Sequence, residues 1–193
     1  LFDVSVKENW ENFYNELVEE GVQVDVLVNN AGILPKFKRF DRYSDEEIER
    51  AININFYSCV YSVKTFLPML LKSTDPGIVN IDSSAALMSL AGTSMYSASK
   101  AALKGFTEAL REEFRGKCYV GLVCPGFTKT DIFRGQSNAG GKGEKVINMI
   151  STDCDLMVKM IMFGLEHKQA LQIHGVDAHA MSVFGKLLPV NGS

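Results

Sequence analysis

Two residues at the start of a predicted helix have types and a spacing that suit acid–base chemistry. Tyr96 and Lys100 are four positions apart in the run SMYSASKAALKGFTEALREEF, so a helix places their side chains on one face. A tyrosine of ordinary pKa, about 10, is a poor acid–base catalyst at neutral pH, whereas a cation beside it favours the tyrosinate. A Tyr–Lys pair alone is more typical of a surface contact, so the rest of the chain decides its meaning.

Small and polar residues follow three apolar segments that read as strands. Asn29-Asn30-Ala31-Gly32 follows VDVLV, Asp82-Ser83-Ser84 follows IVNI, and Pro125-Gly126 ends GLVC. Small residues let a ligand approach the backbone, an asparagine amide ties neighbouring segments together, and a serine hydroxyl donates to a substrate oxygen. Each of these sequences alone is also typical of an ordinary turn.

A further polar residue, Asn55, lies within the apolar helical run AININFYS. An asparagine inside a helix is mildly unfavourable. Either it is exposed or hydrogen-bonded in the core, or it faces the strand ends and binds a water.

The elements that must position these residues alternate along the chain. Apolar strands are expected at 1–5, 24–30, 77–84, 119–126 and 171–175, and amphipathic helices at 7–21, 44–71, 96–114, 155–168 and 177–189. Ser44 and Glu47 form a capping-box pattern at the start of the second helix. The alternation predicts an α/β fold, a Rossmann-like doubly wound parallel sheet, as a single domain over 1–193. Ligands on such sheets bind beyond the carboxyl ends of the strands, where the residues above are expected.

Composition limits the class of protein. The 193 residues carry a formal net charge of −3 and are 46% hydrophobic, which is typical of a globular protein and gives no basic footprint for nucleic acid. Apolar runs are too short for a membrane span. The four cysteines and three histidines have no metal-ligand spacing, so we expect no metal, free thiols and a cytoplasmic protein.

Taken together, these residues resemble the motifs of the short-chain dehydrogenase/reductase family over nearly the whole chain. The spacing matches as well, because Ser83 precedes Tyr96 by 13 positions, and this selects Ser83 over Ser84. The matching positions are Asp3-Val4, Asn29-Asn30-Ala31-Gly32, Asn55, Ser83, Tyr96-Ser97-Ala98-Ser99-Lys100, and Pro125-Gly126 with Thr130.

The resemblance implies an oxidoreductase that transfers a hydride between NAD or NADP and an alcohol or carbonyl substrate. Tyr96 would be the general acid–base, Lys100 would contact the nicotinamide ribose and favour the tyrosinate, Ser83 would polarise the substrate oxygen, and Asn55 would hold a relay water through its backbone. The cofactor-binding set implied by the family is Asp3 and Val4 (adenine), Asn30, Ala31 and Gly32 (adenosine ribose), Tyr96, Lys100, and Pro125, Gly126, Thr128 and Thr130 (carboxamide).

The chain departs from the family at its beginning. No TGxxxGxG-like run is present, and the GGKG at 140–143 lies in the wrong place for a phosphate loop. We therefore expect a fold that lacks about 55 to 60 N-terminal residues of the family's first βαβα portion. Without them, strand 1–5 has no partner, strand 24–30 becomes a bare apolar edge, and cofactor binding is weak. A non-catalytic cofactor sensor or scaffold is the alternative function, although such proteins tend to lose the Tyr or the Lys.

The neighbours of the predicted catalytic residues indicate a lipophilic substrate. They are mostly apolar: Leu34, Ala85, Leu87, Leu90, Phe127, Ile132 and Phe133. Lys129 and Arg134 keep a substrate carboxylate possible. The polar, Gly-rich segment 127–145 is expected to be a lid that orders on binding. Extra apolar residues on helices 44–71 and 96–114 predict that these helices are buried on more than one face, and the family resemblance then implies a homodimer or homotetramer.

Overall fold

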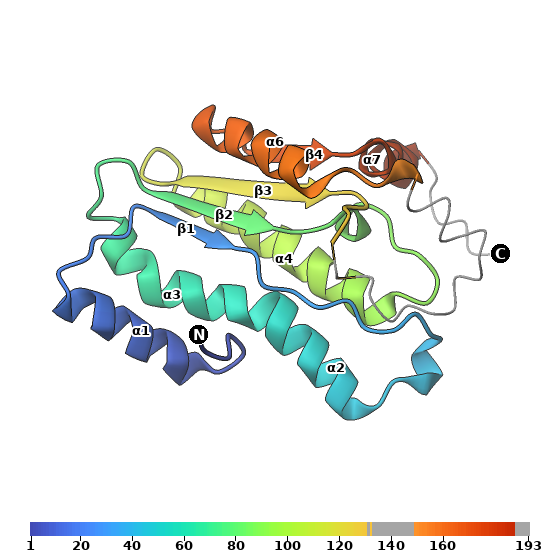
Figure 1. The fold of residues 1–193 in the computed structure, drawn as a ribbon, viewed down its shortest axis with the longest axis horizontal. Coiled ribbons are helices and arrows are strands. Elements are labelled where there is room, and N and C mark those ends of the chain that lie inside the picture. The colour runs from blue at the N-terminus through green and yellow to red at the C-terminus, as the bar shows by residue number, and fades with distance from the viewer. Residues whose placement is uncertain (131, 133–148, 188–193) are drawn as a thin grey trace.

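The computed structural model describes residues 1–130, 132 and 149–187. Its centre is a parallel sheet of four strands in the order β1-β2-β3-β4. These strands are β1 (Val26–Asn29), β2 (Gly77–Ile81), β3 (Tyr119–Pro125) and β4 (Leu171–His174). Adjacent strands are in register from Val26 opposite Gly77 and from Gly77 opposite Tyr119, so their carboxyl ends reach the same edge of the sheet (Figure 1).

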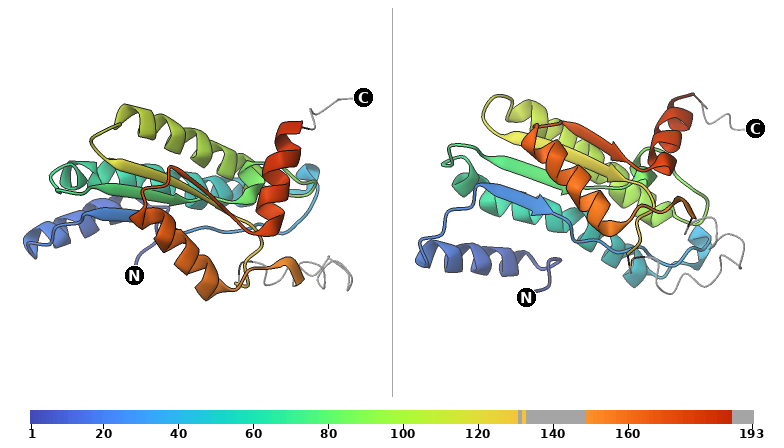
Figure 2. Two further views of the ribbon diagram at one scale, coloured as in Figure 1. Left: turned by 90° about the horizontal axis from the view of Figure 1, so that it is seen from above. Right: turned by 45° about the horizontal axis from the view of Figure 1, so that its top comes forward.

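Helices cover both faces of this sheet, as predicted for a doubly wound fold. Helices α3 (Ser58–Leu70) and α4 (Ser94–Glu113) lie on one face, and α6 (Cys154–Glu166) lies on the other (Figure 2). Helix α1 (Lys7–Glu19) packs against α3, and α7 (Val176–Leu187) follows β4. The main core lies between the sheet and α3 and includes Phe66, Leu70, Ile78 and Val120. The fold class predicted from the alternating pattern is therefore confirmed.

The predicted helix at 44–71 is interrupted. It begins with the predicted capping box, in which the Ser44 hydroxyl accepts from the Glu47 backbone and the Glu47 carboxylate accepts from the Ser44 backbone. Helix α2 (Asp45–Ile52) then passes into a π-helical turn at Asn53–Tyr57 before α3 begins. Wide turns of this kind often occur at functional sites, and this one contains Asn55.

The predicted strand at 1–5 is wrong, because the described structure shows a turn there and no sheet pairing. The Asp3 carboxylate accepts hydrogen bonds from the Ser5 backbone and hydroxyl, and the Trp10 indole donates to the Val4 carbonyl at 2.9 Å. Local bonds of this kind satisfy a segment that has no neighbouring strand. The segment therefore folds back onto the start of α1.

Strand β1 is an edge of the sheet, as predicted. Leu27 and Asn29 point toward α3, so Val26 and Val28 point to the opposite face. Helix α6 contacts β3 and β4 on that face, and Val26 and Val28 remain 39% and 52% exposed. The expectation of a bare apolar edge is confirmed.

Candidate functional site

A cavity of about 440 Å³ opens beyond the carboxyl ends of β1, β2 and β3. It is lined by residues that follow each of these strands, by the start of α4, and by one side of α6. The described lining residues are Asn30, Gly32, Leu34, Phe37, Ile81, Asp82, Ser83, Ser84, Ala85, Leu90, Thr93, Tyr96, Lys100, Pro125, Gly126, Phe127, Thr128, Thr130, Ile132, Cys154, Met157, Val158, Ile161 and Met181. Nine of the predicted catalytic and cofactor-binding residues thus share one cavity.

Tyr96 and Lys100 lie in the first two turns of α4 and are almost wholly buried, with 9% and 4% of their surface exposed. The Lys100 ammonium donates to the Ile81 carbonyl at 2.9 Å and lies 6.0 Å from the centroid of the Tyr96 ring. A buried ammonium exerts a stronger field on its neighbours than one in water, because less solvent screens it. The pair is therefore not a surface contact, which was the other interpretation of its spacing.

Ser83 joins the end of β2 to this pair. Its backbone is extended (φ −164°) and its hydroxyl oxygen accepts a hydrogen bond from the Ala85 backbone at 3.1 Å. Because the backbone N–H occupies an acceptor site of the oxygen, the hydroxyl hydrogen stays available to a ligand in the cavity. Ser84 is buried at the first position of the following 3₁₀ turn, Ser84–Ala86. Both serines line the cavity, so the choice of Ser83 stays a prediction.

Asn55 is fully buried behind the cavity and does not line it. Its amide donates to the Ile33 carbonyl (2.9 Å) and the Ser99 hydroxyl (3.0 Å) and accepts from the Ile33 backbone N–H (2.8 Å). These bonds hold the segment after Gly32 against α4. A methyl group added at Gly32 would contact the Asn55 oxygen at 3.5 Å and the Lys100 ammonium at 3.8 Å. Asn55, Gly32 and Lys100 are therefore close neighbours, although they are far apart in sequence.

A buried chain of hydrogen bonds supports the ends of β1 and β2. The Asn29 amide donates to the Asn80 side-chain oxygen (2.8 Å) and accepts from the Ser62 hydroxyl (2.6 Å). The Asn80 amide donates to the Thr107 hydroxyl (2.8 Å). Four buried polar side chains thus connect two strands with α3 and α4. Asn29 has the connecting role that its amide suggested, whereas Asn80 and Thr107 were not singled out from the sequence.

The Pro125–Gly126 turn is held from two sides. Gly126 donates to the His174 carbonyl (2.7 Å), and the next backbone N–H, that of Phe127, donates to the Asp177 carboxylate (2.7 Å). A backbone bridge joins Thr128 to Thr152. These contacts set Pro125, Gly126, Thr128 and Thr130 along one wall of the cavity. Asp177 comes from the first turn of α7, and no local motif around it predicts this contact.

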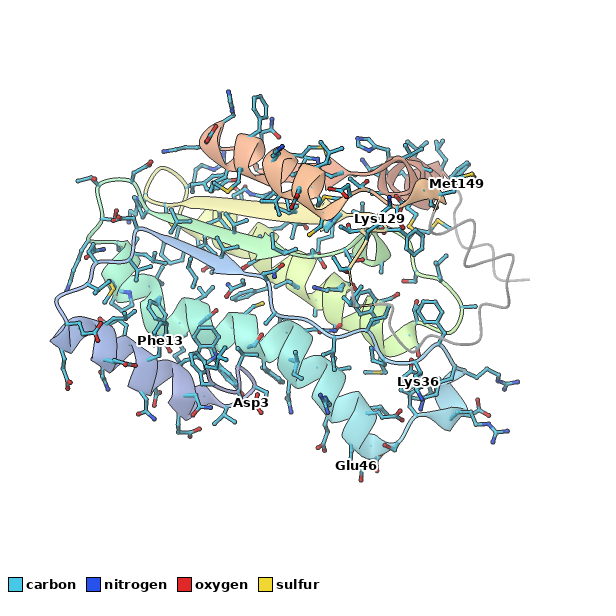
Figure 3. The ribbon with its side chains drawn as sticks, viewed as in Figure 1. Asp3, Phe13, Lys36, Glu46, Lys129 and Met149 are labelled. Atoms are coloured by element: carbon cyan, nitrogen blue, oxygen red, sulfur yellow. The ribbon has the colours of Figure 1, made fainter. Side chains whose placement is uncertain are left out.

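The remaining predicted residues lie elsewhere. Ala31 does not line the cavity, although both of its neighbours do. Asp3 lies beside α1, far from Lys129 near the cavity (Figure 3), and neither Asp3 nor Val4 lines the cavity. Their contact with an adenine ring stays a prediction. Leu87 also lies outside the lining, and Phe133, Arg134 and the GGKG run fall outside the described residues.

Sequence reasoning missed the wall formed by α6. Cys154, Met157, Val158 and Ile161 line the cavity at spacings of three, four and seven, which is one stripe of a helix. The stripe can be read from the sequence, but only the fold shows which surface it faces. This wall adds apolar side chains to the predicted set, of which Leu34, Ala85, Leu90, Phe127 and Ile132 line the cavity.

Asp82 is the unusual charged group of the site. It directly precedes Ser83, is 4% exposed, and neither carboxylate oxygen forms a hydrogen bond of good geometry in the part of the chain that the structure describes, although the Ser83 backbone N–H is close enough to act on the carboxyl and lower its pKa. Burial raises the pKa of the Asp82 carboxyl to about 7, and the positive charge of Lys100 opposes that rise. Burial likewise raises the pKa of the neighbouring Cys124 thiol to about 12, so that thiol is protonated at neutral pH.

Comparison with known proteins agrees with this geometry. The family model described as short chain dehydrogenase matches residues 1–141. The chain belongs to the short-chain dehydrogenase family. It is 33% identical over 174 residues to the putative oxidoreductase SadH of Mycobacterium tuberculosis, covering 86% of this chain and 63% of that protein. It is 36% identical over 137 residues to human retinol dehydrogenase 10, covering 69% of this chain and 40% of that protein.

Solved structures of family members have the same fold. A short-chain dehydrogenase from Streptomyces avermitilis superposes with a TM-score of 0.81 at 26% identity, covering 96% of this chain and 72% of that one. An alcohol dehydrogenase from Thermococcus sibiricus, complexed with 5-hydroxy-NADP, superposes with a TM-score of 0.73 at 25% identity, covering 90% of this chain and 70% of that one. The chain spans less than two thirds of the length of SadH and of retinol dehydrogenase 10. No helix among the described residues is long and apolar enough to cross a membrane.

Proposed function

We propose that this chain carries the catalytic half of an NAD(P)-dependent oxidoreductase that interconverts an alcohol and a carbonyl. One observation carries the proposal: Tyr96, Lys100, Ser83 and the Pro125–Gly126 turn come from separate elements and converge on one cavity. Residues of these types are needed together to position an oxygen and move a proton to or from it. A scaffold protein has no need of a buried Lys100 beside Tyr96.

The cavity suits the nicotinamide end of NAD(P). Gly32 lets a flat group approach the backbone, and Lys100 offers donors to ribose hydroxyls. The fixed turn at Pro125–Thr128 offers backbone groups to a carboxamide. When bound, NAD(P) supplies or accepts the hydride. The choice between NAD and NADP stays open. In the family the residues that select between them follow the second strand, and the sequence of this chain has no counterpart of that segment.

The chain's own residues then divide the remaining work. Ser83 donates its free hydroxyl hydrogen to the reacting oxygen and orients it. Tyr96 gives a proton to that oxygen during reduction or takes one during oxidation. The charge of Lys100 favours the tyrosinate that oxidation requires. Asn55 holds the segment after Gly32 against Ser99 of α4, next to Lys100; its backbone is proposed to hold the relay water.

The walls of the cavity favour a lipophilic alcohol or ketone. The side chains beyond the polar end are mainly aliphatic, aromatic or methionine, and they come from α6, α7 and the segments after β1, β2 and β3. Lys129 is described and does not line the cavity, which weakens the alternative of a substrate carboxylate. Among the relatives, the retinol dehydrogenase named above and an 11-beta-hydroxysteroid dehydrogenase 1A of Arabidopsis thaliana carry the names of lipophilic alcohols. We infer the same class of substrate here.

Replacement of Tyr96 by phenylalanine tests the proposal. Tyr96→Phe keeps the ring and removes the acid–base hydroxyl, so turnover of a lipophilic ketone panel should fall by about 10²–10⁴-fold while cofactor binding persists. Nicotinamide absorbance follows the rate, with cofactor raised until the rate saturates. Tyr14→Phe is the matched control, because Tyr14 packs on Phe66 away from the cavity. Equal rates for Tyr96→Phe and the unaltered chain would refute the role of Tyr96.

A further inference from the structure

The mechanism above leaves one buried charge at the site unused, that of Asp82. It lies at the end of β2 between Ile81, whose carbonyl accepts from Lys100, and Ser83. Its backbone N–H donates to the Val123 carbonyl at 2.7 Å, so the residue is fixed between two strands. Among the described residues the carboxylate forms no hydrogen bond of good geometry, and only the Ser83 backbone N–H acts on it as a donor. A buried ion with so little hydrogen bonding is costly unless an opposite charge compensates it.

The surroundings of Asp82 identify the compensating charge. The titratable groups that interact electrostatically with its carboxyl lie on α4 (Lys100, Lys104 and Glu108), on β3 (Cys124) and on α3 (Cys59). Lys100 has the largest electrostatic effect of these on Asp82, and Lys104 and Glu108 oppose each other. The thiols of Cys59 and Cys124 are neutral near pH 7, because burial raises the pKa of both. Asp82 and Lys100 are therefore the buried charged groups that act on each other most strongly, although no ion pair joins them: the Lys100 ammonium bonds instead to the carbonyl of Ile81, which directly precedes Asp82.

Direct recognition of a substrate by Asp82 does not fit its burial. Less than 1 Å² of each carboxylate oxygen is accessible, so a ligand in the cavity cannot reach either oxygen without rearrangement. Asp82 is among the residues that line the cavity, but its carboxylate oxygens are shielded from it. Any influence on the reaction must therefore pass through a neighbour that does reach the reacting atoms.

We propose that Asp82 is a positioning residue that acts as the counter-charge of Lys100 and controls how much of the Lys100 charge is available to favour the Tyr96 tyrosinate. An ionised Asp82 opposes a second negative charge on Tyr96 and offsets Lys100, whereas a neutral Asp82 leaves the Lys100 charge uncompensated. This inference rests on the proposed function only in its effect on Tyr96. The coupling between Asp82 and Lys100 is a property of the folded chain.

Carboxyl NMR measures the coupling without any turnover. The ¹³Cγ signal of Asp82, assigned from its loss in Asp82→Asn, is followed against pH in the unaltered chain, in Lys100→Met and in the control Lys104→Met. Loss of the Lys100 cation should raise the titration midpoint of Asp82 by about one pH unit or more, and loss of Lys104 should raise it less. A midpoint that does not rise in Lys100→Met, or that rises as far in Lys104→Met, would overturn the proposal. Circular dichroism checks that each variant is folded.

The pH dependence of alcohol oxidation measures the consequence for Tyr96. This experiment does not need Lys100→Met, so it still tests the proposal if that variant does not fold. Asp82→Asn removes the negative charge at nearly constant size, so the rise of kcat/KM with pH should shift to lower pH by about one unit. A purely structural role would lower the rate without moving the profile, and that result would overturn the proposal. If the unaltered chain turns over no substrate, the oxidoreductase proposal fails, and the NMR titration still decides the coupling.

Discussion

Any side chain at Gly126 would collide with the Asp177 carboxylate, so we predict that Gly126→Ala destabilises the fold. A methyl group at Gly126 would lie 2.1 Å from one Asp177 carboxylate oxygen and 2.4 Å from the other. A carbon atom and an oxygen atom that are not bonded to each other do not approach that closely, so Gly126→Ala must displace the Asp177 carboxylate. That carboxylate accepts the Phe127 backbone N–H at 2.7 Å, and the displacement breaks this bond. We expect a loss of about 1.5–3 kcal/mol, the usual cost of losing a hydrogen bond to a charged group.

A double-mutant cycle separates this cause from a general sensitivity of the turn. Asp177→Ala removes the same hydrogen bond without adding a methyl group, and should cost about 2 kcal/mol. In the double variant the methyl group meets no carboxylate, so the two costs should not add, and the coupling should be about 2 kcal/mol. Urea unfolding of the four proteins gives each free energy of unfolding. Gly105→Ala is the control, because a methyl group there has nothing within 4 Å.

Additive costs in this cycle would refute the reasoning, since they would mean that the methyl group and the carboxylate do not interfere. The variants also test the cavity. Gly126 and Phe127 line it, so a turn freed from Asp177 should weaken nicotinamide binding more than it slows the proton transfer at Tyr96. A rise in the cofactor KM with little change in kcat is the expected pattern.

Three further predictions follow from buried groups and exposed rings. Because burial raises the folded pKa of Asp82 to about 7 from its ordinary 3.8, the stabilisation of its neutral form is complete below about pH 4 and is lost as pH rises through 7. Urea unfolding should show that the free energy of unfolding of the unaltered chain falls by up to about 4 kcal/mol over this pH range, relative to that of Asp82→Asn. If the difference between the two proteins does not change with pH, the burial of the Asp82 carboxyl is contradicted. Asn80→Ala leaves the buried Asn29 amide N–H without its acceptor, whereas the Thr107 hydroxyl keeps its bond to the Leu103 carbonyl. The change should cost about 1–3 kcal/mol, and a cost under about 0.5 kcal/mol would show that the chain of hydrogen bonds is dispensable. Tyr57 is 42% exposed and stacks on Tyr61, beside α3. If this surface forms the predicted dimer, Tyr57→Glu should be a monomer by light scattering. An unaltered chain that is itself a monomer would contradict the predicted dimer.

The convergence of the candidate site residues could be predicted because each motif is short and the strands are parallel. A motif directly after an apolar strand must lie at the carboxyl edge of the sheet, so Ser83, Gly32 and Gly126 converge whatever the loops do. Tyr96 and Lys100 needed only the period of one helix. The strand expected at 1–5 fails for a related reason. Strand formation depends on a neighbouring strand, and local bonds to Ser5 and Trp10 replace it when none is paired.

What the sequence could not provide are contacts between distant elements that involve single polar groups. Asp177 lies 50 residues from Phe127 and has no motif around it. Asp82 precedes the proposed catalytic serine, Ser83, but its burial and its lack of well-formed hydrogen bonds depend on how β2, β3 and α4 pack. The π-helical turn at Asn55 belongs to the same class, because a helical pattern of apolar residues does not show where one extra residue widens the helix.

These distant contacts and the catalytic residues belong to one structural unit, which shapes how any variant must be interpreted. Asn55 holds the segment of Gly32, Asn29 and Asn80 join the strands to α3 and α4, and Asp177 holds the turn at Gly126. Each of these bonds stabilises the fold and also sets the position of a cavity wall. A fall in activity on its own therefore cannot separate a lost catalytic group from a shifted wall. A titration midpoint, a pH profile or a coupling free energy can, because each reports on a named pair of groups whether or not the whole site remains productive.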